Sequence, residues 1–158
     1  AVEFAKMAES SGAAFVTVHG RTRMQMYSGT ADWDKIAEVV NAVRIPVIGN
    51  GDVFSGTDAA ALAARTGCAG IMAARGAQGN PFLFAEIRAA LRGEDYVPPS
   101  ARARLDAALR HISEYIAAHG DGAFADMRKH IAWYTKGMYG STAELSELVR
   151  RFRDEVSD

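Results

Sequence analysis

The stretch VTVHGRTRMQMYSGTADWDKI, residues 16–36, contains the unit from which the first part of the chain is built. It begins as a short apolar run without charge, as is expected of a strand buried in a parallel sheet. The run ends at His19 in a polar loop with two arginines, and apolar residues at helical spacing begin again at Trp33. The stretch therefore predicts a strand, a polar loop and a helix.

The same order recurs twice more before residue 95. Strands are predicted at residues 14–18, 47–48 and 70–74. Helices are predicted from Trp33 through Val43, from a cap near Thr57 to Arg65, and from Asn80-Pro81 to Leu91, with Asn80 as N-cap and Pro81 as the first helical residue. Repeated units of this kind predict an α/β fold with a parallel sheet.

A break in this repetition falls at residues 95–100, DYVPPS, where we place a domain boundary. One domain is predicted at 1–95, and an all-helical domain at 100–158. Its amphipathic helices are predicted from Ser100 to Gly120, from about residue 123 to Lys136, and from the capping-box sequence STAE at 141–144 onward. The second domain is thus expected to be a small all-α helical bundle.

Three parallel strands do not close a barrel. A complete TIM (βα)8 barrel needs roughly 250 residues, or about 30 per unit. We therefore expect residues 1–95 to be the last three βα units of such a barrel, with about five units upstream. Because an open three-stranded sheet exposes unpaired edges, this piece is also expected to self-associate.

Composition excludes several classes of protein. The 158 residues are 49% hydrophobic and carry a formal net charge of −1, so contact with nucleic acid must come from a local basic patch. The single cysteine, Cys68, allows neither an internal disulfide nor a cysteine-based zinc site, and the histidines lack metal-site spacing. With no membrane-spanning stretch and no signal peptide, we expect a cytoplasmic protein without membrane or metal partners.

Polar segments that contain glycine follow all three predicted strands: VHGRTR (18–23), IGNGD (48–52) and AARGAQGNP (73–81). In barrel enzymes the carboxyl ends of the strands carry the active site, and backbone N–H groups in such loops suit a phosphate. These segments predict a bound phosphorylated ligand. Two plainer interpretations stay open: His19 as a hydrogen-bond partner of a neighbouring strand end, and Arg21 and Arg23 as solvated charges.

Three segments resemble, in order and spacing, the last three strands of the tRNA-dihydrouridine synthases, most closely the bacterial B-type branch: residues 16–36, IPVIGNGDVFSGTDA (45–59) and GCAGIMAARGAQGNPFLFAEI (67–87). The similarity continues through MRKHIAWYTKGMYG (127–140) and covers nearly the whole chain. The resemblance implies a TIM barrel that holds flavin mononucleotide (FMN) and a helical domain that helps to hold tRNA. The implied reaction is the NADPH-driven reduction of uridine to 5,6-dihydrouridine.

The resemblance also implies which residues hold the cofactor. His19 lies on the FMN side, and two segments match those that hold the phosphate. The implied cofactor-binding residues are His19, Asn50, Gly51, Asp52, Ala74 and Arg75. The family usually has glycine in place of Ala74; the substitution keeps the backbone N–H but adds a methyl beside the phosphate.

The RNA-binding residues implied in the same way are Arg21, Arg23, Arg128, Lys129 and Lys136, although a solvated face is an alternative for those of the helical domain. No catalytic residue is expected in this chain, because the family's proton-donating cysteine lies in the first part of the barrel. Cys68 enters the last strand at the opposite end and cannot replace it. Two rival functions are an FMN barrel reductase for a small molecule and a non-catalytic RNA-binding fragment.

Overall fold

The computed structural model describes residues 1–120, 124–136 and 150. The chain forms two compact units: a sheet unit, Ala1–Ala77 with Leu83–Tyr96, and a helical unit, Gln78–Phe82 with Val97–Asp158. Five residues of the predicted first domain thus group with the helical unit. The predicted helix from residue 141 onward lies outside the described residues.

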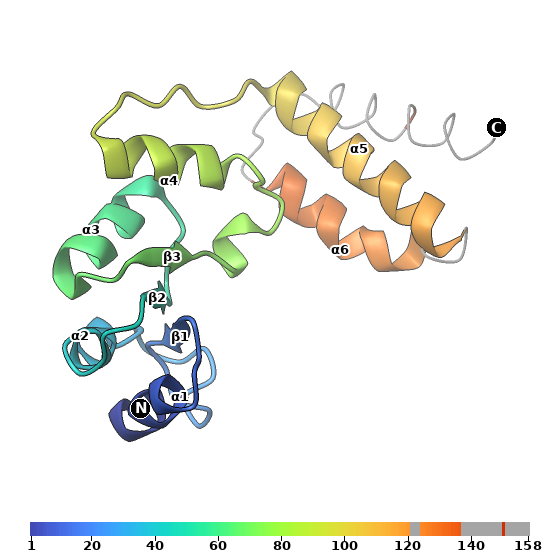
Figure 1. Cartoon of the computed structure of the whole chain (residues 1–158). Helices are drawn as coiled ribbons and strands as arrows, with labels where there is room; N and C mark the ends of the chain where they lie inside the picture. The colour runs from blue at the N-terminus through green and yellow to red at the C-terminus, as the bar shows by residue number, and fades with distance from the viewer. Residues whose placement is uncertain (121–123, 137–149, 151–158) are drawn as a thin grey trace. The chain divides into compact units, whose positions relative to one another are not determined.

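The sheet unit contains three parallel strands in the order of their numbers (Figure 1): β1 (Val16–His19), β2 (Val47–Asn50) and β3 (Gly70–Met72). The predicted α/β class and all three predicted strands are confirmed, whereas the number of barrel units stays a prediction. The register sets His19 beside Asn50, and Asn50 beside Met72. The last residues of the strands therefore form one row at the carboxyl edge of the sheet.

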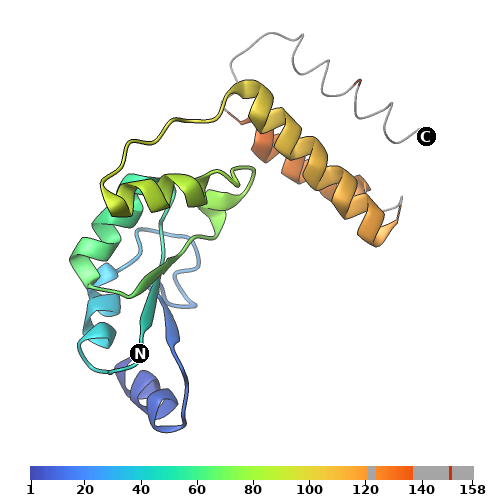
Figure 2. The ribbon, with the colours of Figure 1, turned by 45° about the horizontal axis from the view of Figure 1, so that its top comes forward.

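Four helices alternate with these strands: α1 (Val2–Ser10), α2 (Trp33–Val40), α3 (Gly56–Thr66) and α4 (Leu83–Arg92). α2 and α3 pack against the strands, α1 contacts α2, and α4 contacts α3 (Figure 2). The buried core between helices and sheet includes Ile36, Val39, Leu62 and Leu83. Burial of these side chains, each worth about 1.5–3 kcal/mol, is the main term that stabilises the sheet unit.

Side-chain alternation along the strands divides the sheet into two faces. Val16, Val18 and Ile71 pack against the core below the helices. A Cβ on Gly49, which faces the same way, would lie only 2.7 Å from Leu62 Cδ2, so glycine is what allows α3 to approach β2 this closely. The opposite face carries the row His19, Asn50 and Met72, and it is available for a binding site because these helices do not cover it.

Two helix starts differ from those predicted. α3 is capped by Ser55, whose hydroxyl accepts a hydrogen bond from the N–H of Asp58 at 3.1 Å, rather than near Thr57. α4 begins at Leu83 instead of Pro81, and the preceding Gln78–Phe82 segment groups with the helical unit.

The helical unit pairs α5 (Ala101–His119) with α6 (Phe124–Thr135). Ser100 caps α5 and Gly120 ends it, as predicted. The buried contacts between the two helices involve Leu105, Leu109, Ile112, Met127 and Tyr134. Arg104 donates to the carbonyls of Tyr134 and Lys136 at 2.9 and 3.3 Å, which satisfies the free acceptors at the end of α6. Within the described residues, no helix has the length and apolar character needed to cross a membrane.

The substitution Gly79→Ala is expected to destabilise the chain more than Gly93→Ala. Both glycines have a φ of +68°, and a left-handed conformation costs an alanine about 1–2 kcal/mol. A Cβ on Gly79 would also collide with the backbone of Trp133 and Tyr134, whereas nothing lies within 4 Å of a Cβ on Gly93. Overpacking should add about 1–3 kcal/mol at Gly79. Equal shifts of the two melting temperatures, followed by circular dichroism, would contradict this close approach.

Candidate functional site

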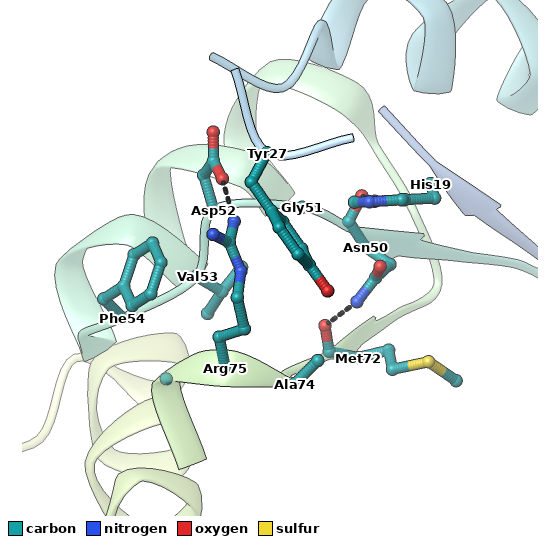
Figure 3. A pocket seen from close by; sticks show the side chains of 11 residues that line it. His19, Tyr27, Asn50, Gly51, Asp52, Val53, Phe54, Met72, Ala74 and Arg75 are labelled. Atoms are coloured by element: carbon teal, nitrogen blue, oxygen red, sulfur yellow. Dashed lines mark hydrogen bonds and ion pairs between the residues drawn. The ribbon is translucent and has the colours of Figure 1, made fainter. Parts of the chain in front are cut away.

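A cavity of about 130 Å³ opens at the carboxyl edge of the sheet (Figure 3). Its walls come from the segments that follow the three strands. The lining residues are His19, Tyr27, Asn50, Gly51, Asp52, Val53, Phe54, Met72, Ala74, Arg75 and Gly76. The cavity therefore contains all six residues predicted to bind the cofactor, although their roles stay predictions.

Five lining residues were missed by the sequence interpretation: Tyr27, Val53, Phe54, Met72 and Gly76. Val53, Phe54 and Gly76 directly follow predicted residues, so proximity in the chain was a usable signal. Met72 lies beside Asn50 in the sheet register, and it could have been found from the alignment of strand ends. No pattern marked Tyr27, which lies in the middle of the long loop after β1.

The carboxylate of Asp52 joins the loops that follow all three strands. Arg21, after β1, donates from one terminal nitrogen to both carboxylate oxygens at 2.8 and 2.7 Å. Arg75, after β3, donates to Asp52 Oδ1 at 3.0 Å, and the N–H of Ala31 donates to Oδ2 at 2.7 Å. Two guanidinium groups and one carboxylate leave one net positive charge at the cavity wall. Such a wall favours an anion.

Opposing effects act on the pKa of Asp52. Burial alone would raise it, but hydrogen bonds from Arg21 and from the N–H of Ala31, together with the positive charges of Arg21 and Arg75, outweigh burial and hold the pKa below its usual value. Asp52 is therefore ionised at neutral pH. Its backbone has a φ of +53°, a conformation that aspartate tolerates better than most residues.

Arg21 is buried, with only 3% of its side chain exposed. Besides Asp52 it binds the carbonyls of Ser28 and Gly29 at 2.5 and 2.9 Å, so it ties the beginning of the loop between β1 and α2 to a later part of the same loop. The guanidinium thus points toward Asp52 and the two carbonyls, and the predicted contact of Arg21 with RNA stays a prediction. Arg23, two residues further along, is exposed.

The guanidinium of Arg75 lies near the carboxylate of Asp52 and the rings of Tyr27 and Phe54 (Figure 3). Its guanidinium carbon is 4.3 Å from the centroid of the Tyr27 ring and 5.4 Å from that of Phe54. Such cation–π contacts restrict a side chain that would otherwise move freely. About a third of the Arg75 side chain, 34%, stays exposed, so donors of its fork can still reach a ligand in the cavity.

His19 and Asn50 form a chain of hydrogen bonds along the row of strand ends. His19 Nδ1 lies 3.1 Å from the carbonyl oxygen of Asn50, and Asn50 Nδ2 donates to the carbonyl of Met72 at 2.7 Å. Because a carbonyl only accepts, this bond requires the proton on Nδ1 and leaves Nε2 of the neutral ring as an acceptor. His19 therefore makes the bond to a neighbouring strand end that the plainer interpretation predicted, and it also lies in the cavity wall.

Comparison with known proteins decides the family. The dihydrouridine synthase family, Dus, matches residues 1–157. The chain belongs to this family. The resemblance read from the strand ends is thereby confirmed.

Several curated dihydrouridine synthases are similar to this chain. A probable tRNA-dihydrouridine synthase of Mycobacterium tuberculosis (strain ATCC 25618 / H37Rv) is 44% identical over 141 residues, 87% of this chain and 36% of the relative. One of Rickettsia conorii is 42% identical over 155 residues, 97% of this chain and 46% of the relative. One of Synechocystis sp. is 41% identical over 148 residues, 93% and 42% of the two chains. The chain thus spans less than half the length of these three relatives.

The helical unit carries the other predicted RNA-binding residues. Arg128 and Lys129 are exposed on α6, and Lys136 is exposed just beyond its end. Met127 and Tyr134 are buried, as expected of the apolar stripe on the same helix. Among the described residues, no group of three or more His, Cys, Asp or Glu side chains is arranged to hold a metal ion.

The stability of the sheet unit is expected to fall in acid because of Asp52. Since its folded pKa lies below the unfolded value of about 3.9, its ion pairs stabilise the fold above that value and are lost as the pH falls through the folded pKa. Urea unfolding at a series of acidic pH values measures this loss. The free energy of unfolding should change less with pH in Asp52→Asn than in the unmodified chain. Its change with pH should stay close to wild type in Asp34→Asn, which removes an exposed pair with Arg65.

Proposed function

We propose that this chain provides the phosphate end of an FMN site and a tRNA-contacting helical unit to an enzyme that reduces uridine in tRNA to 5,6-dihydrouridine. The observation that carries the proposal is the cavity at the ends of three parallel strands. Arg75 lies in its wall, and the cluster of Arg75, Asp52 and Arg21 has one net positive charge. Membership of the dihydrouridine synthase family supports the same reaction.

The residues of the cavity fit a phosphate group. Arg75 binds Asp52 through one terminal nitrogen, so other N–H groups of its fork can bind phosphate oxygens. The backbone at Gly51 and at Ala74 lines the same cavity and can add N–H donors. The cavity volume of about 130 Å³ is well below the roughly 300 Å³ or more of sites for drug-sized ligands. The proposal therefore assigns this cavity to the phosphate and not to the flavin ring.

A bound FMN would supply the hydride for C6 of uracil, with NADPH as the electron source and a proton added at C5. The residues of this chain bind and orient. Arg75 neutralises phosphate charge, and the bond of His19 to the carbonyl of Asn50 fixes the imidazole at the strand ends. For RNA, the exposed cations of α6 would supply a local basic patch on the helical unit, and Arg23 would be a separate contact on the sheet unit; a chain of net charge −1 needs such local contacts.

Replacing Arg75 tests the phosphate site. Arg75→Ala should weaken FMN binding roughly 10- to 100-fold, because a hydrogen bond to a charged group is worth about 1.5–3 kcal/mol. The dissociation constant is measured by titrating FMN with the chain and following the ³¹P resonance. Arg44→Ala is the matched control, because it removes an exposed arginine just before β2, at the other end of the sheet. Equal affinities in both variants would remove Arg75 from the site.

Replacing two lysines tests the RNA surface. Lys129→Ala combined with Lys136→Ala should lower tRNA affinity and reduce the slope of log affinity against log salt by about 0.7–0.9 for each lost phosphate contact. The control is Arg102→Ala combined with Arg110→Ala, which removes two exposed cations of α5 that are paired with Asp106 and Glu114. A salt slope equal to that of the control would show the two lysines to be ordinary solvated charges.

A further inference from the structure

We propose that Arg21 and Asp52 are positioning residues: their ion pair fixes the guanidinium of Arg75 at the cavity wall and anchors the loop between β1 and α2 beside it. Phosphate binding would then depend on two side chains that act through Arg75. The inference deepens the proposed function and rests on it, because it takes the phosphate of FMN as the ligand of this cavity.

The burial of Arg21 is the first observation. Its side chain is 3% exposed, and its Nε is buried without a hydrogen-bond partner among the described residues. Burying a guanidinium is costly unless its partners compensate, and here they are the carboxylate of Asp52 and the carbonyls of Ser28 and Gly29. An arginine that only had to contact RNA would stay in solvent. This one is built into the protein.

The second observation is that both supports of Arg75 depend on this pair. On one side, Asp52 Oδ1 accepts hydrogen bonds from Arg75 at 3.0 Å and from Arg21 at 2.8 Å. On the other side, the ring of Tyr27 covers the guanidinium at 4.3 Å, and Tyr27 directly precedes Ser28 and Gly29, whose carbonyls Arg21 binds. Loss of the ion pair would therefore weaken both supports of Arg75, because it separates the loop segment next to Tyr27 from Asp52.

Charge and position predict opposite results for Asp52→Asn. The variant removes a negative charge, so the net charge of the cluster rises from one to two positive charges. If Asp52 acted only as a countercharge, phosphate would bind more tightly. If it holds Arg75 in place, phosphate binds more weakly although the charge is more favourable. The sign of the change separates the two roles.

The experiment titrates FMN by ³¹P resonance with the unmodified chain and with Asp52→Asn. We expect the dissociation constant to rise at least threefold in Asp52→Asn and to stay unchanged in Glu38→Gln, which removes one exposed carboxylate of α2. Hydrogen exchange at the N–H of Ala31, which binds Asp52, should accelerate in Asp52→Asn alone. Tighter or unchanged FMN binding by Asp52→Asn would overturn the proposal.

Arg21→Lys is the second variant, should Asp52→Asn fail to fold. It keeps the charge but loses the fork that binds the carboxylate and two carbonyls at once. Weaker FMN binding, with the fold retained in circular dichroism, supports positioning, and unchanged binding overturns it. Arg75→Ala separates this inference from the proposed function. If Arg75→Ala weakens binding and the other two variants do not, only positioning is wrong; if none of the three weakens it, the phosphate site itself is wrong.

Discussion

The ion pair between Arg21 and Asp52 is the interaction on which the candidate site depends. A parallel sheet aligns the ends of its strands but leaves the loops beyond them unspecified. Here one carboxylate, in the segment after β2, receives a guanidinium and an N–H from the loop after β1 and a second guanidinium from the segment after β3. Three segments distant in sequence are thereby held at one point, and the cavity is the space beside it.

The division of the sheet into two faces makes this site available. Apolar residues of β1 to β3 turn toward α2 and α3, where their burial stabilises the unit. The opposite row, His19, Asn50 and Met72, is free of that packing and is tied together by hydrogen bonds instead. The chain belongs to the dihydrouridine synthase family, and we propose that this edge holds the phosphate of its cofactor.

Much of this arrangement could be predicted from the sequence, for physical reasons. Uncharged apolar runs identify the strands, and the carboxyl ends of parallel strands must lie at one edge, so the six predicted cavity residues come together. The partner of Arg21 could not be predicted, because Asp52 is 31 residues away and nothing in HGRTR indicates which arginine turns inward. Tyr27 was missed for the same reason: its place is set by the closed loop and not by a local pattern.

The path of the chain between β3 and α4 has a consequence for how the protein can be divided. The backbone leaves the sheet unit after Ala77, contributes Gln78–Phe82 to the helical unit, returns as α4 and leaves again at Val97. The two units are thus joined by three covalent crossings. A cut in the segment DYVPPS, residues 95–100, would separate α6 from the segment that contains Gly79, whose backbone lies against Trp133. A helical unit separated from this chain would therefore keep its contacts around Gly79 only if it retained residues Gln78–Phe82.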